Sequence, residues 1–279
     1  MRASFQYLGR GSWLARRDPR IPLIAAGVFV IGAVQLRDAR HLLVALAVAL
    51  VYYRSAAIPF PKVRLQWLYL AFTIGMIATL NTIITGGRAG GFAQGELHVL
   101  FAVPWFGAPI TAEAISLSVS QALRFLGIIA VSMPIAYSIA PGDFAVAVRR
   151  LGLPDRAAVT IDLTLRFLPT LVQEFAETID AQRLRGYDPL GGKGGPVSRI
   201  RRIAPIFVPV TVGSIAGAED TIDAMDLRGF GVGRRTWLRQ LRYDRTDLAV
   251  ISLFAAFALT ATFLSFSGRS QHYLLPFLV

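Results

Sequence analysis

The sequence predicts an all-α polytopic membrane protein with about five transmembrane helices and a cytoplasmic pair of long amphipathic helices. Three observations lead to this fold class. The 279 residues are 54% hydrophobic and only 16% charged, which is too little charge to cover a soluble globule. Several apolar runs are long enough to span a bilayer. One continuous third of the chain is too polar to span, yet its apolar residues recur with helical periodicity.

The apolar runs set the number of spans. They cover residues 21–36, 42–53, 66–85, 115–140 and 248–266. A spanning helix needs about 20 residues, which the last three runs provide. The first run is short, and the second spans only if it continues through Arg54 toward Phe60, with the arginine side chain reaching back to the headgroups. We therefore expect four or five spans and favour five.

The spans divide the sequence into three regions. Residues 1–140 form an N-terminal membrane region with about four transmembrane helices, residues 141–245 a cytoplasmic helical region, and residues 246–279 a C-terminal transmembrane helix and tail.

The basic residues indicate the orientation. With the N-terminus in the cytoplasm, 24 of the 29 Lys and Arg residues lie on the cytoplasmic side, four lie outside, and Arg124 lies within the fourth span. This bias follows the positive-inside rule. It also explains the net charge of +12 without a nucleic-acid partner, because the charges follow the membrane boundaries. We expect a multi-pass protein of the plasma membrane whose partner is the lipid bilayer, with a cytoplasmic N-terminus and an external C-terminus.

Residue types exclude several chemistries and leave one question open. The absence of cysteine excludes thiolate catalysis, iron–sulfur clusters and cysteine-ligated zinc. The three histidines, His41, His98 and His272, are far apart in sequence, so we expect no metal site.

Arg124 has two interpretations: it faces a partner or a buried carboxylate, or it reaches the outer interface.

The polar third of the chain predicts two helices. In residues 160–180 apolar residues recur at steps of four and three, which predicts an amphipathic helix, with a kink at Pro169. A second helix, from about 205 to 227, begins almost purely apolar and ends with several acidic residues. Residues 189–196 between them are rich in glycine and proline and predict a hinge or turn.

A repeat marks the ends of these two helices. Residues 178–187 read TIDAQRLRGY and residues 221–230 read TIDAMDLRGF, so seven of ten positions are identical, and the last is aromatic in both. The copies lie 43 residues apart and each closes a predicted helix. A shared pattern of this length at equivalent positions indicates a shared task.

Ordinary helix ends explain part of the repeat. Gly186 and Gly229 suit the position after a helix, where the backbone turns left-handed. Arg185 and Arg228 suit the last turn, where the helix dipole favours a cation by about 0.3–1 kcal/mol. The repeated alanine, leucine and aspartate need another explanation.

Docking to a partner supplies that explanation. Small alanines permit close approach, and a guanidinium can bind a carboxylate or carbonyl cluster through two hydrogen bonds. Two similar helix ends imply a partner with two-fold or pseudo-two-fold symmetry. We expect no catalytic residues and no metal ligands. The predicted docking residues are Ala181, Arg185, Gly186, Ala224, Arg228 and Gly229.

At these residues the chain resembles the transmembrane T component of energy-coupling factor (ECF) transporters, the EcfT/CbiQ-type family. That family carries the motifs Ala-Gln-x-Ala-Arg-Gly and Ala-Met-x-Ala-Arg-Gly, and here residues 181–186 read AQRLRG and residues 224–229 read AMDLRG. Leucine replaces the second alanine in both copies. Residues 18–20, 149–154 and 166–170 look like further family features. The resemblance adds four supporting residues in the helices, namely Arg166, Pro169, Gln182 and Met225.

The resemblance implies a mechanism for the coupling-helix region 141–245. Two ABC ATPase subunits, as a homo- or heterodimer, each take one helix end in a groove, and ATP binding closes the dimer. The helices pass that motion to a small membrane S component, for vitamin or Ni/Co uptake. This chain would hold no cofactor and catalyse nothing, since ATP and Mg belong to the partner ATPases. It contains no G-x-x-x-x-G-K-[ST] phosphate loop of its own.

Three other functions remain as alternatives. One is the permease subunit of a conventional ABC importer, although doubled arginine ends favour the coupling role. Another is a Mg-dependent membrane transferase using Asp220, Asp223 and Asp226, which are spaced three apart on one helical face. The third is an ion channel or secondary carrier, weakened by the lack of paired intramembrane acids.

Overall fold

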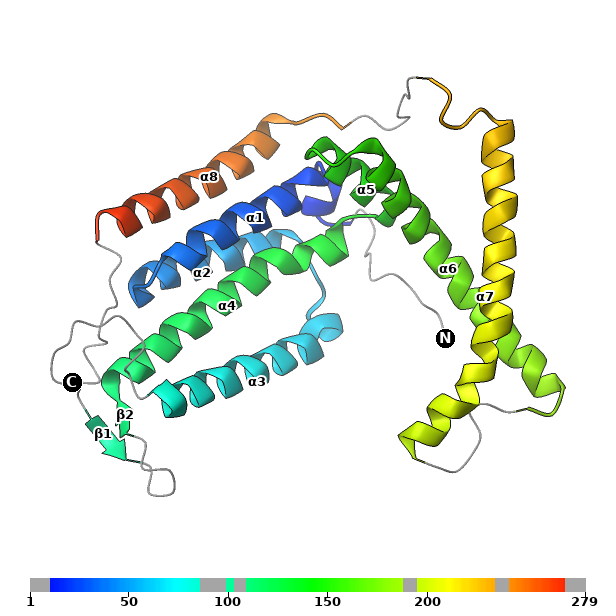
Figure 1. Ribbon diagram of the computed structural model, residues 1–279. Helices are drawn as coiled ribbons and strands as arrows, with labels where there is room; N and C mark the ends of the chain where they lie inside the picture. Colours follow the sequence, from blue (N-terminus) through cyan, green and yellow to red (C-terminus); the bar gives the residue numbers. More distant parts are fainter. Residues whose placement is uncertain (1–10, 86–98, 103–108, 188–194, 234–240, 269–279) are drawn as a thin grey trace. The chain divides into compact units, whose positions relative to one another are not determined.

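The computed structural model describes residues 11–85, 99–102, 109–187, 195–233 and 241–268. Within those ranges the chain forms eight α-helices, one 3-10 turn and a short antiparallel hairpin of strands (Figure 1). The fold is therefore helical as predicted, with the hairpin as an addition. Most of the predicted hinge, 189–196, lies outside the described residues.

Contacts divide the chain into two compact units. Pro141–Leu241 belongs to one, which we call the α5–α7 unit, and Gln6–Ala140 with Arg242–Val279 forms the other, which we call the bundle unit. The elements of the bundle unit are the turn Leu14–Arg16, α1 (Arg20–Gln35), α2 (Ala39–Ser55), α3 (Phe60–Thr85), β1 (Val99–Ala102), β2 (Pro109–Thr111), α4 (Ala112–Ser138) and α8 (Arg245–Phe266).

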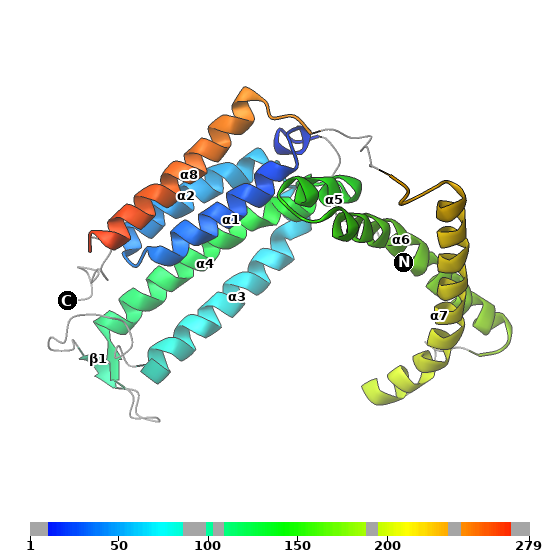
Figure 2. The same cartoon turned by 45° about the horizontal axis from the view of Figure 1, so that its top comes forward.

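The bundle unit is built around α4 and α1. Helix α4 packs against α1, α2 and α3, and α8 packs on the far side of α1. Figures 1 and 2 show these five helices running side by side. Strands β1 and β2 pair antiparallel just before α4, with Phe101 opposite Ile110.

Helix length bears on the predicted spans. Four helical segments within the described part of the chain are long and apolar enough to cross a membrane: Phe60–Ile83, Ala112–Ser138, Ile200–Leu227 and Arg245–Phe266. Three of them match the last three predicted runs. Helices α1 and α2 have 16 and 17 residues, below the length of about 20 that a straight span needs. The fourth segment lies in α7, a helix for which the sequence did not predict a span.

The second predicted run needs a correction. It does not continue as a helix toward Phe60, because α2 ends at Ser55. The backbone then turns at Ala57, which has a φ of 48°, and α3 begins at Phe60. Arg54 is consequently in the last turn of α2, where the helix dipole favours a cation.

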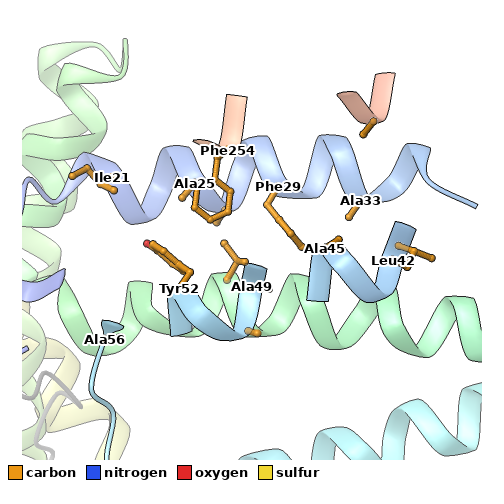
Figure 3. Packing of buried hydrophobic residues seen from close by; sticks show 14 of the residues in the cluster. Ile21, Ala25, Phe29, Ala33, Leu42, Ala45, Ala49, Tyr52, Ala56 and Phe254 are labelled. Atoms are coloured by element: carbon orange, nitrogen blue, oxygen red, sulfur yellow. The ribbon is translucent and has the colours of Figure 1, made fainter. Parts of the chain in front are cut away.

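Aromatic rings fill the centre of the bundle unit. Phe29 of α1 meets Phe254 edge to face at 6.2 Å and stacks on Phe257 at 5.1 Å. Tyr52 of α2 meets Phe254 edge to face at 5.2 Å (Figure 3). Gly32 permits this packing, since a Cβ there would lie 2.7 Å from the Phe257 ring. The consecutive helices α1 and α2 thereby share one aromatic core with α8, which lies far along the sequence.

Arg124 has its partners within the chain. Its Nε donates to the carbonyl oxygen of Ala33 at 3.1 Å, and its Nη2 donates to that of Leu36 at 2.6 Å. The last carbonyls of a helix lack helical donors, and a cation stabilises that end of the helix dipole. The partners that the structure gives Arg124 are backbone carbonyls rather than a carboxylate, and they lie at the end of α1 that the predicted orientation places on the outer side.

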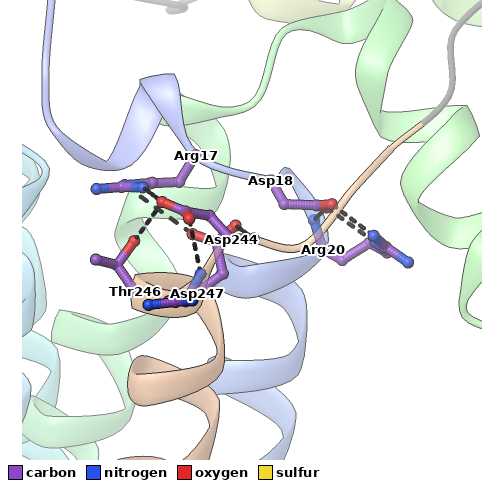
Figure 4. Close-up of polar contacts among 7 residues, drawn as sticks. Arg17, Asp18, Arg20, Asp244, Thr246 and Asp247 are labelled. Carbon is purple, nitrogen blue, oxygen red and sulfur yellow. Dashed lines mark hydrogen bonds and ion pairs between the residues drawn. The ribbon is translucent and has the colours of Figure 1, made fainter.

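An ion pair joins the segment before α1 to the start of α8. Arg17 Nη1 donates to Asp244 Oδ2 at 2.6 Å, across 227 residues of sequence (Figure 4). Asp244 caps α8, and it forms a capping box with Asp247. The pair therefore fixes the beginning of α8 against the N-terminal segment.

A second ionic contact lies beside the first. Asp18 accepts hydrogen bonds from the backbone N–H, Nε and Nη2 of Arg20, at 2.9, 2.9 and 2.6 Å. The Arg20 guanidinium also lies 3.6 Å from the centre of the Tyr243 ring. Both Asp18 and Arg20 are buried, so pairing offsets the cost of removing their charges from water.

The α5–α7 unit contains three helices: α5 (Pro141–Arg150), α6 (Asp155–Leu184) and α7 (Pro196–Leu227). The predicted helix over 160–180 is confirmed and extends further at both ends. Helix α7 begins nine residues before the predicted start at 205. Pro196 lies in its first turn, where a backbone N–H would have no helical acceptor, so the N–H that proline lacks is not needed. Helix α6 runs through Pro169, which leaves the carbonyl of Leu165 without its helical donor.

Helices α6 and α7 cross each other (Figure 1). At the crossing, Phe175 meets Phe207 edge to face at 5.3 Å, and Ser214 Oγ donates to Glu174 at 3.3 Å. Among the described side chains, α6 buries Ala158 and α7 buries Ile206, and the others are partly or fully exposed. Most described side chains of the two long helices are therefore not buried within the chain.

Candidate functional site

The first copy of the repeat forms the end of α6, and we call residues 178–187 the first tip. The helix ends at Leu184, and Gly186 follows with a left-handed φ of 81°. The N–H of Tyr187 donates to the carbonyl oxygen of Gln182 at 2.9 Å, and the N–H of Gly186 donates to that of Arg183 at 2.9 Å. This pair of bonds is the Schellman motif, which satisfies the last carbonyls of a helix.

The second copy forms the end of α7 in the same way, and we call residues 221–230 the second tip. Gly229 has a φ of 68°. The N–H of Phe230 donates to the carbonyl oxygen of Met225, and the N–H of Gly229 to that of Asp226, both at 2.9 Å. The prediction that Gly186 and Gly229 adopt a left-handed backbone is confirmed, and the two tips share one backbone structure.

The arginines occupy equivalent places on the two tips. Arg185 has φ −84° and ψ 8°, and Arg228 has φ −88° and ψ 6°. Both are exposed, as are Ala181 and Ala224 one turn earlier. Each tip thus places an exposed cation directly after the helix and a small residue beside it.

Sequence reasoning missed the leucines of the tips as candidate functional residues. Leu184 is 91% exposed and Leu227 is 90% exposed, among the highest values of the large apolar side chains described. Each directly precedes its arginine. The signal was present in the sequence, because leucine replaces the usual alanine of the motif in both copies.

The supporting residues fall into two groups. Gln182 and Met225 accept the closing hydrogen bond of each tip, but with backbone carbonyls, so the bond itself does not require these side chains. Arg166 and Pro169 lie in the middle of α6, and the structure does not bring them to the tips. Arg166 Nη2 lies 3.5 Å from Asp162 Oδ2, as an exposed pair one turn apart.

The structure does not support a metal site on the acidic end of α7. Within the described residues, which include Asp220, Asp223 and Asp226, no group of three or more histidine or acidic side chains is placed to hold a metal ion. The magnesium-dependent transferase therefore has no assembled centre in this part of the chain.

Comparison with known proteins identifies the family. A sequence profile described as CbiQ, cobalt transport protein, matches residues 10–238. The chain belongs to the CbiQ family. The resemblance inferred from the two arginine motifs is confirmed.

Curated relatives give the same result over almost the whole chain, and each carries the name energy-coupling factor transporter transmembrane protein EcfT. The relative from Staphylococcus aureus is 27% identical over 275 residues, 94% of this chain and 97% of its own length. The relative from Bacillus selenitireducens is 26% identical over 91% of this chain and 93% of its own length. The relative from Lacticaseibacillus paracasei is 31% identical over 87% of this chain and 90% of its own length.

Family membership establishes the general nature of the protein. It is a multi-pass membrane protein and the transmembrane component of an ECF transporter, and its family is non-catalytic. The prediction that this chain is not an enzyme is confirmed. The match favours the coupling role over the conventional permease and the transferase.

Proposed function

We propose that this chain is the coupling subunit of an ECF-type importer, which transmits the ATP-driven closure of two ABC ATPase subunits to a substrate-binding S component. Each tip docks in a groove of one ATPase subunit. The transported substrate belongs to the vitamin or Ni/Co class that the resemblance implies. The observation that carries the proposal is the pair of exposed arginine tips with one shared backbone structure.

The chemistry of the tips suits docking. A guanidinium that leaves water on docking requires a carboxylate or carbonyl partner, and its planar donors can bind such a group bidentately. The neighbouring leucines, Leu184 and Leu227, supply apolar area that is exposed in the isolated chain. Ala181 and Ala224 leave room for the partner to approach the helix.

The shape of α6 and α7 suits transmission of movement. They contain 30 and 32 residues, which corresponds to lengths of about 45 and 48 Å. The contacts of Phe175 with Phe207 and of Ser214 with Glu174 join the helices where they cross. Movement of one tip is therefore passed to the other helix. The exposed apolar surface is available to the S component and the inner leaflet.

The proposal assigns α7 to the cytoplasmic side, although Ile200–Leu227 is apolar enough to span. If α7 spanned the bilayer, the two tips would lie on opposite sides and could not dock to one ATPase dimer. The six arginines from Arg228 to Arg245 would then lie outside, against the positive-inside bias. A cytoplasmic α7 accords with a cytoplasmic N-terminus and places both tips together.

ATP and Mg bind the partner subunits in this proposal, and this chain performs no chemical step. Its residues bind the ATPases and orient them against the membrane region. Selection of the substrate belongs to the S component.

Affinity purification of the tagged full-length chain from its native membranes tests the proposal. We expect ABC ATPase subunits and a small membrane protein in the eluate, with Mg-dependent ATP hydrolysis. The double variant Arg185→Ala, Arg228→Ala should insert normally but lose the ATPases. The matched control is Arg156→Ala, an exposed arginine near the start of α6, which should retain them. Full retention by the double variant would overturn the proposal.

A further inference from the structure

An apolar groove lies between the first half of α3 and the second half of α4, within the bundle unit. Its volume is about 1160 Å³, and it is lined by residues between Leu65 and Phe72 of α3 and by Ile129, Ser132 and Met133 of α4. Figure 2 shows the two helices side by side. The Tyr137 hydroxyl donates to Gln66 Oε1 at 2.8 Å and joins them near the start of α3.

Large exposed side chains form the α3 side of the groove. Leu65, Leu68, Tyr69 and Phe72 recur at helical spacing and are 68–72% exposed. Membrane helices that pack closely on other helices usually present small residues at the interface. The stripe extends over about 10 Å of helix, within the roughly 15 Å of hydrocarbon in one leaflet. It therefore suits the acyl chains of a lipid better than a packed protein helix.

Two cations continue this stripe toward the start of α3. Lys62 lies three residues before Leu65, and Arg64 lies four residues before Leu68, so each is one turn from the groove. Both are exposed, and within the part of the chain that the structure describes neither has a hydrogen bond or an ion pair. Because Cα–Cβ bonds tilt toward the N-terminus of a helix, both side chains extend away from the groove toward the membrane surface.

The helices around these cations supply no counter-ion. Helices α2 and α3 contain no aspartate or glutamate, and the single acidic residue of α4, Glu113, lies in its first turn, at the opposite end from Met133. Arg54 in the last turn of α2 adds another positive charge shortly before α3 begins. An anion that is not part of these helices is required to neutralise this end of the groove.

A polar side chain lies between the cations and the apolar stripe. Gln66 lines the groove one turn after Lys62. Its Oε1 accepts the Tyr137 hydroxyl, and its amide N–H groups have no acceptor among the described residues. The ester carbonyls of a phospholipid lie between its phosphate and its acyl chains, and they accept hydrogen bonds from such donors. Cations, amide and apolar stripe thus follow the order of groups along a phospholipid.

We infer that the groove binds a phospholipid with an anionic headgroup from the cytoplasmic leaflet, with its phosphate at Lys62 and Arg64 and its acyl chains along the stripe from Leu65 to Phe72. Basic sites between membrane helices on the cytoplasmic side suit anionic headgroups, which are concentrated in that leaflet. The basic-residue bias places the start of α3 on that side. The site is distant in sequence from the tips, so its failure would leave the proposed coupling role intact.

Native mass spectrometry of the delipidated full-length chain in detergent tests the headgroup preference, with dioleoylphosphatidylglycerol or dioleoylphosphatidylcholine added. We expect the first lipid to bind about tenfold more tightly than the second. Lys62→Ala, Arg64→Ala should remove most of this preference. The matched control Arg242→Ala, Arg245→Ala removes two exposed arginines at the start of α8 and should retain it. Equal binding of the two lipids, or a preference unchanged by the first variant, would overturn the inference.

Two further measurements test the groove itself. Ala71→Trp fills the groove from an exposed lining position and should weaken phosphatidylglycerol binding severalfold without lowering the melting temperature. Ala256→Trp at an exposed position of α8 is its control and should bind normally. In native membranes, a photoreactive residue in place of Phe72 should crosslink to phospholipid. Crosslinking mainly to a protein would show that another chain occupies the groove and would overturn the inference.

Discussion

The bundle unit and the α5–α7 unit use similar residues for different purposes. In the bundle unit, aromatic rings from α1, α2 and α8 pack against each other, and buried charges such as Asp18 and Arg20 are paired within the chain. In the α5–α7 unit, two helices of 30 and 32 residues leave most of their side chains exposed. The buried rings and buried ion pairs of the bundle unit have partners within the chain, whereas for the exposed ends of α6 and α7 we propose partners on other chains.

The arginines show the difference most clearly. Arg124 binds the last carbonyls of a neighbouring helix, so its guanidinium is used in folding. Arg185 and Arg228 follow helices whose ends are already closed by backbone bonds, and both residues are exposed. We propose that their guanidinium groups serve docking. Substitutions in the bundle should therefore change stability, and substitutions at the tips should change coupling.

The largest effect is expected from the double variant Arg185→Ala, Arg228→Ala. Removing a charged group from a docked contact costs about 2 kcal/mol or more, so each tip should bind its ATPase about 30-fold more weakly. Uptake into membrane vesicles should fall to background while the melting temperature of the detergent-solubilised chain stays unchanged. Lysine at both positions should restore only part of the uptake, since it lacks the planar fork. A large fall in the melting temperature of the double variant would show that the tip arginines also stabilise the fold, which contradicts the contrast between a stabilising bundle and exposed tips.

The second effect tests the bundle. Phe254→Ala removes a ring that contacts both Phe29 and Tyr52, and we expect a loss of about 3 kcal/mol in unfolding free energy. Phe263→Ala is the matched control, because that ring lies on the same helix and is 65% exposed. Denaturant unfolding in detergent measures both. Equal losses for the two variants would show that the aromatic core does not determine the stability of the bundle.

The third effect concerns the shape of the tips. Gly186→Ala and Gly229→Ala place a Cβ on a left-handed backbone and should each strain a tip by about 1 kcal/mol. ATPase capture should fall several-fold, and asparagine should be tolerated better than alanine. The control is Gly213→Ala within α7, where open space surrounds the added Cβ. If ATPase capture were unaffected by alanine at both Gly186 and Gly229, docking would not require the left-handed backbone at the two tips.

The smallest effect is a pH dependence of the bundle. Hydrogen bonds from the backbone N–H of Arg245, then from the Arg17 side chain and the Thr246 hydroxyl, lower the pKa of Asp244. A carboxylate with a lowered pKa in the folded state stabilises that state above its unfolded pKa of about 3.9 and loses this contribution as the pH falls through the folded pKa.

Asp244→Asn should therefore lower the melting temperature slightly at pH 7 and have little effect once Asp244 itself is protonated. Melting curves from pH 7 down to the acid limit of the detergent sample measure the difference. If the difference in melting temperature between Asp244→Asn and the unchanged protein grew as the pH fell, the contribution of the Asp244 carboxylate would have the opposite sign to the one expected.

The sequence could predict the tips because their structure is local. A glycine after an amphipathic helix specifies a left-handed cap, and the repeat identified two such caps, at Gly186 and Gly229. The pair of Arg17 with Asp244 could not be predicted, since it joins residues 227 positions apart in the sequence and depends on how the chain between them folds. The partners of Arg124 are backbone carbonyls, which have no signature in the sequence. The early start of α7 was missed because the almost purely apolar run begins only near residue 205, whereas residues 197–204 include three arginines.

Structure determination of the purified assembly by cryo-electron microscopy, with ATP-bound ATPases, tests the central claim most directly. The account predicts that the Arg185 and Arg228 guanidinium groups each lie within hydrogen-bond distance of carboxylate or carbonyl oxygens in an ATPase groove, on the same side of the membrane. Tips that point into solvent, or an α7 that crosses the bilayer and places Arg228 outside, would contradict it.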